Sequence, residues 1–177
     1  SSQARACVPR IIHQTFADLN IPDKYKGFSH LWRMLNPAWL HILWTNDDIL
    51  QFVALNYPSM VATFVRYETD IQRSDAFRYL VLASIGGVYA DLDYECLVPL
   101  DAYIGNLTTP IAFVAPGRSA NSISNSLMFS AYCPHRWQSV HDALAEAAKR
   151  VQRSWSGKLP RTKVLLSTGP GMLHRWV

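Results

Sequence analysis

The amino-acid sequence predicts an α/β fold, in which helices cover both faces of one sheet. Short apolar runs that are typical of buried strands alternate along the chain with segments of helical periodicity. The chain has 177 residues, which is the length of one domain and enough to bury a substantial core. Near its centre, the pair Gly86-Gly87 separates a helical segment from an alternating one. In a fold of this class, the ligand site is expected at the carboxyl ends of the strands.

The predicted strands are short runs bounded by turn residues. They cover residues 10–16, 39–45, 88–97, 110–115 and 163–167, and another apolar run spans residues 126–132. The run at 88–97 alternates, so that Val88, Ala90 and Leu92 share one face. Its other face carries Tyr89, Asp91, Asp93 and Glu95. Asp91 and Asp93 are therefore expected to point the same way, near the end of a strand that follows a glycine turn.

The predicted helices cover residues 30–35, 46–56, 58–67, 74–85 and about 134–155. The first ends at Asn36-Pro37, because proline disfavours helix in the residue before it. The second could be capped by the polar run at 46–48. The fourth places Asp75 and Arg78 on one face, since they are three residues apart. The last carries an apolar stripe that indicates core packing rather than a cofactor site, formed by Trp137, Val140, Leu144, Ala148, Val151 and Trp155.

Composition and charge exclude some classes of function. A net charge of +4, spread along the chain, does not indicate a nucleic-acid partner. No run approaches the roughly 20 apolar residues of a transmembrane helix, and residues 1–7 resemble no signal peptide. Any membrane association is therefore expected to use segments outside this chain.

Cysteine usage and one sequon add little to the functional prediction. The three cysteines, Cys7, Cys96 and Cys133, are too few and too scattered for a zinc site or a disulfide framework, although one pair could bridge. Asn106 begins an Asn-Leu-Thr glycosylation sequon, which matters only if the protein enters the secretory pathway.

The same-face acids Asp91 and Asp93 point to a divalent cation. Two carboxylates a few ångströms apart repel each other unless a cation lies near them. Oxygen-only ligands favour Mg²⁺ or Mn²⁺, and these ions also bind substrate phosphates. The pair therefore suggests a metal-assisted reaction on a phosphate-bearing substrate. Ordinary kinases, dehydrogenases and hydrolases are disfavoured, because the sequence contains no P-loop, no G-x-G-x-x-G and no G-x-S-x-G motif.

Each candidate residue also has a structural interpretation. A D-x-D pair can be a solvated strand end, and Asp75 with Arg78 can form an ordinary helical ion pair worth about 0.2–0.5 kcal/mol. Glu95 is expected to be solvated, and Asn125 is either a turn residue or a ligand contact. The remaining candidates are expected to pack in the core, although one tryptophan could stack on a ligand: His13, Trp32, Trp39, Trp44, Tyr79 and Tyr89.

Six motifs, taken together, resemble the D-x-D sugar transferases of glycosyltransferase family 32. They are PRIIHQTF at 9–16, NPAW at 36–39, RSDAFRY at 73–79, GGVYADLD at 86–93, SNSLMFS at 124–130 and STGPG at 167–171. They occur in the order of the family and span nearly the whole chain. Within the family, the sequence is most similar to the inositol phosphoceramide mannosyltransferases, and its core also resembles mannosyltransferases of N-glycan outer chains and glucosylating bacterial toxins.

The resemblance implies a GT-A (Rossmann-like) fold over residues 1–177, a nucleotide-diphosphate sugar donor, Mn²⁺ or Mg²⁺, and retention of the anomeric configuration. Asp93 would bind the metal directly, and Asp91 would contact the ribose or sugar of the donor, or the metal through water. Asp75 and Arg78 would hold hydroxyls of the transferred sugar, Asn125 could contact the donor, and His174 could complete the metal shell. No catalytic base is expected, because retaining enzymes of this type often lack an evident nucleophile.

The resemblance favours transfer of mannose from GDP-mannose to inositol phosphoceramide or a related glycolipid. A UDP-sugar donor, an N-glycan acceptor or a non-catalytic subunit that binds sugar nucleotides are the alternatives. Relatives usually continue past the Thr-Gly-Pro segment, so a C-terminal acceptor or membrane region is expected to lie outside this chain. In a eukaryote the domain would lie in the Golgi lumen.

Overall fold

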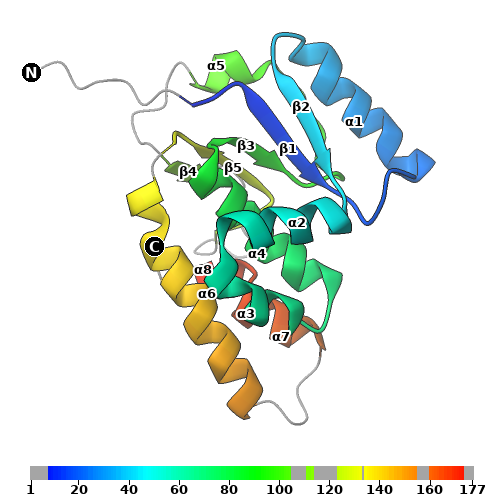
Figure 1. Ribbon diagram of the computed structural model, residues 1–177. Helices are drawn as coiled ribbons and strands as arrows, with labels where there is room; N and C mark the ends of the chain where they lie inside the picture. Colours follow the sequence, from blue (N-terminus) through cyan, green and yellow to red (C-terminus); the bar gives the residue numbers. More distant parts are fainter. Residues whose placement is uncertain (1–7, 105–110, 114–122, 133, 155–159, 174–177) are drawn as a thin grey trace, which may run out of the picture.

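The computed structural model describes residues 8–104, 111–113, 123–132, 134–154 and 160–173 (Figure 1). Its strands are β1 (Ile11–Thr15), β2 (Leu40–Trp44), β3 (Gly87–Ala90), β4 (Ile111–Phe113) and β5 (Leu127–Ser130). Its helices are α1 (Asp23–Leu35), α2 (Asn46–Asn56), η1 (Pro58–Met60), α3 (Val61–Val65), α4 (Asp70–Ser84), α5 (Leu100–Ile104), α6 (Pro134–Ser154), α7 (Pro160–Ser167) and α8 (Pro170–Leu173).

The five strands form one mixed sheet in the order β2-β1-β3-β5-β4. The first three strands in this order are parallel, and His13 of β1 lies in register with Ile42 of β2 and Tyr89 of β3. β5 runs antiparallel to both β3 and β4. The carboxyl ends of β1, β2 and β3 therefore meet at one edge of the sheet, which is where an α/β protein places its ligands.

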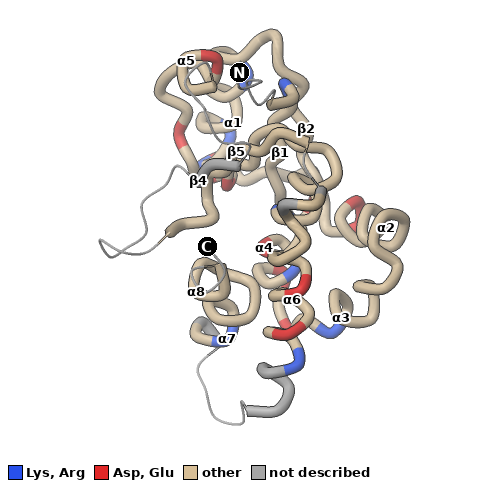
Figure 2. Tube along the Cα trace, turned by 90° about the vertical axis from the view of Figure 1, so that its left-hand side faces the viewer, with Lys and Arg blue, Asp and Glu red and all other residues tan. Residues whose placement is uncertain are grey.

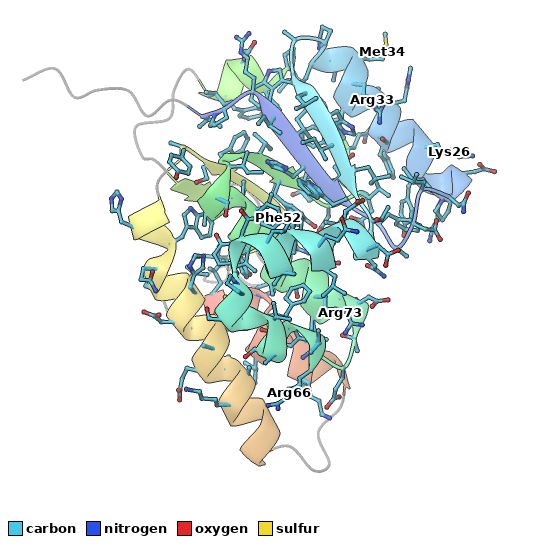
Figure 3. All side chains as sticks on the ribbon, viewed as in Figure 1. Lys26, Arg33, Met34, Phe52, Arg66 and Arg73 are labelled. Atoms are coloured by element: carbon cyan, nitrogen blue, oxygen red, sulfur yellow. The ribbon has the colours of Figure 1, made fainter. Side chains whose placement is uncertain are left out.

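Helices cover both faces of the sheet, as predicted. On one face, Ile12 and Val88 pack with Trp32 of α1 and Leu100 of α5. On the other face, Tyr89 and Met128 belong to a larger cluster that includes residues of α2, α4, α6 and α8. Figure 3 shows Phe52 of α2 within this second layer, where its ring centroid lies 5.4 Å from that of Phe77. The sheet is thus the middle layer of a three-layer domain.

The glycine pair ends α4 and starts β3, as the sequence indicated. Both residues have positive φ, 76° for Gly86 and 99° for Gly87. A Cβ atom on Gly87 would lie 2.5 Å from the carbonyl oxygen of Ile11 on the neighbouring strand. Only glycine combines this backbone conformation with such close packing of two strands.

The structure changes the predicted location of the two acids. β3 ends at Ala90, so the expectation that Asp91 and Asp93 lie on a strand is wrong. The amide of Asp91 still donates to the carbonyl of Ser126, but the amide of Tyr94 donates to the carbonyl of Asp91. This turn ends the strand, and the two acids lie in the segment that leaves the sheet.

The predicted strand at 163–167 is also wrong, because these residues belong to the helix α7. Proline stands at the first position of α7, and Gly169 lies two residues after its last residue, Ser167. A short apolar run does not by itself distinguish a strand from a helix, and these flanking residues are the helical signal.

Two helix starts and one helix cap differ from the prediction. α1 begins at Asp23 instead of residue 30. Thr69 caps α4 in a reciprocal capping box with Gln72, so this helix begins at Asp70 instead of residue 74. α2 begins at Asn46 as expected, but its cap is Thr45, which bonds reciprocally with Asp48. The Thr-x-x-Gln pattern at 69–72 and the Thr-x-x-Asp pattern at 45–48 could have indicated these two caps from the sequence.

Several predicted core residues are confirmed. Trp32, Trp39, Tyr79 and Tyr89 are buried, and so are the stripe residues Trp137, Val140 and Leu144 of α6. His13 is a satisfied core histidine: its Nε2 donates to the carbonyl of Gly86 and its Nδ1 accepts from Trp44. Burial lowers the pKa of His13 to about 4, so the ring is neutral at physiological pH.

The expectations about Cys7, Asn106, Cys133 and His174 fall outside the described residues. Cys96 is a free, buried thiol. Figure 2 shows basic and acidic residues interspersed over the described helices. Within the described part of the chain, no helix is both long and apolar enough to cross a bilayer.

Candidate active site

A cleft of about 480 Å³ opens at the carboxyl ends of β1 and β3. The end of β1 contributes Thr15 and the two residues after it, and the turn after β3 contributes residues 91–93. α4 contributes side chains at successive helical turns, because Asp70, Ser74 and Arg78 are each four residues apart. The other lining residues are Tyr25, Asn46 and Ile71. Both predicted D-x-D acids therefore line this cleft together with Arg78.

Arg78 is the centre of the site's charge network, although its side chain is only 6% exposed. One guanidinium nitrogen lies 3.0 Å from Asp75 Oδ1, and the other lies 3.2 Å from Asp91 Oδ1. The latter nitrogen also donates to the backbone carbonyl of Asn125 at 2.7 Å. The guanidinium carbon lies 4.5 Å from the centre of the Tyr89 ring, within range of a cation–π interaction.

These contacts keep Arg78 charged. Burial alone would lower the pKa of Arg78, but the carboxylates of Asp91 and Asp75 outweigh it and raise the pKa above its usual range. A buried guanidinium of this kind is stable only while its carboxylate partners remain. Arg78 therefore joins the helix α4 to the turn after β3.

Asp75 lies beside Arg78 in the interior, and both of its carboxylate oxygens have hydrogen-bond donors. Asn125 Nδ2 donates to Asp75 Oδ1 at 3.0 Å, and Thr168 Oγ1 donates to Oδ2 at 3.4 Å. Burial raises the pKa of Asp75, while Arg78 and the two hydrogen bonds oppose that rise. The structure thus brings together Asp75, Arg78 and Asn125, and Asn125 contacts both charged residues, through its side chain and its carbonyl.

Asp91 and Asp93 have different environments. Asp91 is 30% exposed, and Tyr89 donates its hydroxyl to Asp91 Oδ1 at 3.1 Å. The Tyr89 hydroxyl also lies 3.0 Å from Thr15 Oγ1, which fixes the orientation of the phenol. Asp93 is exposed at the cleft. The protein therefore orients Asp91 and leaves the Asp93 carboxylate accessible.

The donor set of the cleft suits a hard divalent cation. Asp93 and the exposed part of Asp91 offer carboxylate oxygens, which are the ligands that Mg²⁺ and Mn²⁺ prefer. Among the described residues, no group of three or more His, Cys, Asp or Glu side chains could hold a metal. A metal at this cleft would therefore need further ligands besides these two acids.

An aromatic pair lines another part of the cleft. The rings of Phe16 and Tyr25 meet edge to face, with centroids 6.1 Å apart. The predicted ligand-stacking tryptophan is not among the residues that line this cleft, since Trp32 and Trp39 are buried and Trp44 packs on Phe52 and Phe77. Among the described residues, the aromatic surface that this cleft offers to a ligand comes from Phe16 and Tyr25.

Several residues of the network were not assigned a role from the sequence. Tyr79 accepts from Asn125 and donates to the carbonyl of Thr168, so it joins two segments around Asp75. Tyr89 and Thr15 hold Asp91. Two features of the sequence could have pointed to these residues. Tyr89 lies on the same predicted face as Asp91, and Thr168 lies within the STGPG motif. Glu95 is exposed, as expected, and lies outside the lining of this cleft.

Comparison with known proteins identifies relatives. Residues 22–109 match the family described as "Glycosyltransferase sugar-binding region containing DXD motif". Inositol phosphoceramide mannosyltransferase 1 of Schizosaccharomyces pombe is 34% identical over 166 residues, which cover 92% of this chain and 49% of that protein. Mannosyl phosphorylinositol ceramide synthase SUR1 of Saccharomyces cerevisiae is 34% identical over 165 residues, which cover 92% of this chain and 40% of that protein.

A structural relative supports the fold. The solved structure titled "PaToxG Glycosyltransferase" superposes with a TM-score of 0.64 at 19% identity, and the match covers 95% of this chain and 68% of that one. This likeness confirms the predicted GT-A-type α/β fold. The present chain spans about half the length, or less, of the curated relatives it matches.

Proposed function

The chain belongs to the glycosyltransferase family whose sugar-binding region contains the DXD motif, and on that basis we propose that it is a metal-dependent, retaining hexosyltransferase. The observation that supports this most directly is the cleft in which Asp91, Asp93 and Arg78 meet at the carboxyl ends of the parallel strands. The cleft combines accessible carboxylates, a buried cation and an aromatic wall. A sugar nucleotide needs these three kinds of contact for its diphosphate-bound metal, its sugar and its base.

The protein's own residues would bind and orient the donor. Asp93 and Asp91 would hold Mn²⁺ or Mg²⁺, and the bound ion would act as a Lewis acid that neutralises the diphosphate leaving group. Asp75 and Arg78 would set the orientation of the sugar, because Arg78 lines the cleft and Asp75 fixes its guanidinium. Phe16 and Tyr25 offer an apolar surface for the base.

We propose GDP-mannose as the donor and inositol phosphoceramide or a related glycolipid as the acceptor. Two relatives with 34% identity are named for mannosyl transfer to phosphorylinositol ceramide. The same relatives support a place in the secretory pathway, and we propose the Golgi lumen. His174 and Asn125 remain part of the proposed site, as a metal ligand and a donor contact, respectively.

Calorimetric titration with GDP-mannose, UDP-glucose and UDP-galactose, each with and without Mn²⁺, tests the proposal. We expect GDP-mannose to bind only with Mn²⁺, and Asp93→Asn to weaken binding by at least about tenfold, since it removes one charged ligand. Asp142→Asn is the matched control, because Asp142 is an exposed acid on α6. NMR of the product anomer then tests retention.

Each outcome of the titration has a different meaning. Binding of a UDP-sugar in place of GDP-mannose would replace the proposed donor. Tight, Mn²⁺-dependent binding without transfer to any glycolipid or glycan acceptor would indicate a non-catalytic subunit. Absence of binding for every donor, in a folded protein, would refute the proposal.

A further inference from the structure

A second hollow, of about 210 Å³, lies next to the donor cleft on the α1 and α5 face of the sheet. Its floor is apolar and buried, and is formed by Trp32, Leu100 and Phe129. Its rim is also apolar but exposed: Leu97 is 75%, Tyr103 47% and Val98 38% accessible. We call this hollow the apolar groove. Figure 2 looks towards the side of the molecule where α5 and β5 lie.

The rim of the apolar groove is held in place by the protein. The indole nitrogen of Trp32 donates to the carbonyl of Tyr94 at 2.7 Å, and the amide of Leu100 donates to Asn36 Oδ1 at 2.7 Å. Asn36 is itself anchored to the carbonyl of Trp32. Hydrogen bonds therefore connect both ends of the segment 94–100 to the C-terminal part of α1 and the residue after it. Leu97 remains exposed in a segment whose ends are fixed, so the groove is preformed.

The groove is continuous with the donor cleft along the chain. Asp93 lines the donor cleft, and the next two residues, Tyr94 and Glu95, line the groove. The part of the groove that Tyr94 lines is therefore next along the chain to the acid that we assign to the metal. Among the described residues that line the groove, Glu95 is the carboxylate, and the others are apolar, aromatic or cysteine side chains.

We propose that the apolar groove binds a hydrocarbon chain of the lipid acceptor, with the polar head of the lipid turned towards Asp93. This inference rests on the proposed function, since it concerns the acceptor of that reaction. Single exposed apolar residues are common at protein surfaces, but an apolar rim over a buried apolar floor marks a binding site. A lipid fits because only its chain gains from leaving water, while its head must remain near polar groups.

Photo-cross-linking tests the proposal without requiring turnover. The probe is a ceramide whose 16-carbon acyl chain carries a diazirine, presented in phosphatidylcholine vesicles. We expect cross-links to map to residues 94–103 by mass spectrometry. Leu97→Asp should lower their yield about tenfold, because it places a charge where one apolar side chain contacts the lipid. Leu55→Asp, at a leucine of α2 that is 82% exposed, is the matched control and should change nothing.

Donor binding measured on the same samples separates the two proposals. Cross-links elsewhere on the protein, or a yield that Leu97→Asp does not change, would overturn the groove inference while GDP-mannose binding keeps the proposed function. Loss of donor binding with cross-links at 94–103 would refute the proposed function and leave the groove as a lipid site. Self-association through the groove without lipid cross-links would show that a second protein copy occupies it, which overturns the inference.

Discussion

Arg78→Met is expected to lower the free energy of unfolding by about 4 kcal/mol. The substitution keeps an apolar stem of similar length and removes the guanidinium, so the buried Asp75 loses its cation. Breaking a buried ion pair from one side costs about 3–5 kcal/mol, because the remaining charge is uncompensated. The carbonyl of Asn125 also loses a donor at 2.7 Å. Loss of the ion pair between Arg78 and Asp91 adds less to this cost, since water reaches the partly exposed carboxylate of Asp91.

Urea unfolding followed by circular dichroism measures this loss. Arg66→Met is the matched control, because Arg66 lies at the surface near α3 (Figure 3) and should change stability by less than about 0.5 kcal/mol. The double variant Asp75→Asn, Arg78→Met should be more stable than the sum of the two single losses by about 1–3 kcal/mol. A loss below about 1 kcal/mol for Arg78→Met, or strict additivity, would refute the role of Arg78 as the compensating charge.

Two further predictions concern stability. His13 has a folded pKa of about 4 against about 6.5 unfolded, so its contribution is complete above pH 6.5 and is lost as pH falls towards 4, by about 3 kcal/mol in total. His13→Gln should make the urea midpoint less dependent on pH over that window. A variant whose midpoint depends on pH as strongly as that of the unchanged protein would contradict the assignment. Gly87→Ala should lower the free energy of unfolding by at least about 1–3 kcal/mol. The alanine would have to adopt a positive φ, and its Cβ would collide with the carbonyl oxygen of Ile11. Gly27→Ala in α1 meets open space and should raise the thermal midpoint instead; equal effects would refute this reasoning.

Patterns within a few residues of one another predicted most of the fold. The strand expected at 10–16 is Ile11–Thr15, and that expected at 39–45 is Leu40–Trp44. These runs are bounded by prolines and polar turns, which determine strand ends locally. The prediction failed at 163–167, because five residues carry too little periodicity to separate a strand from a helix.

The candidate site was predictable only in part, because its members come from distant segments. A spacing of three residues was enough to place Asp75 and Arg78 on one face of α4. Asn125 and Thr168 reach Asp75 from 50 and 93 residues away, and no local pattern specifies such contacts. The family resemblance named Asn125 as a donor contact, and the structure adds that its side-chain amide already bonds Asp75 and Tyr79.

The end of β3 at Ala90 changes what the D-x-D pair can do. On a continued strand, Asp91 and Asp93 would share a face and repel each other equally. In the turn, Arg78 and Tyr89 already compensate the negative charge of Asp91. The carboxylate that still lacks a cation is therefore mainly that of Asp93. Asp93, with only a partly exposed Asp91 beside it, binds a divalent ion weakly, because such ions require several oxygen ligands. The diphosphate of the donor would supply the missing oxygens, so metal and sugar nucleotide are expected to bind the cleft together rather than in independent steps.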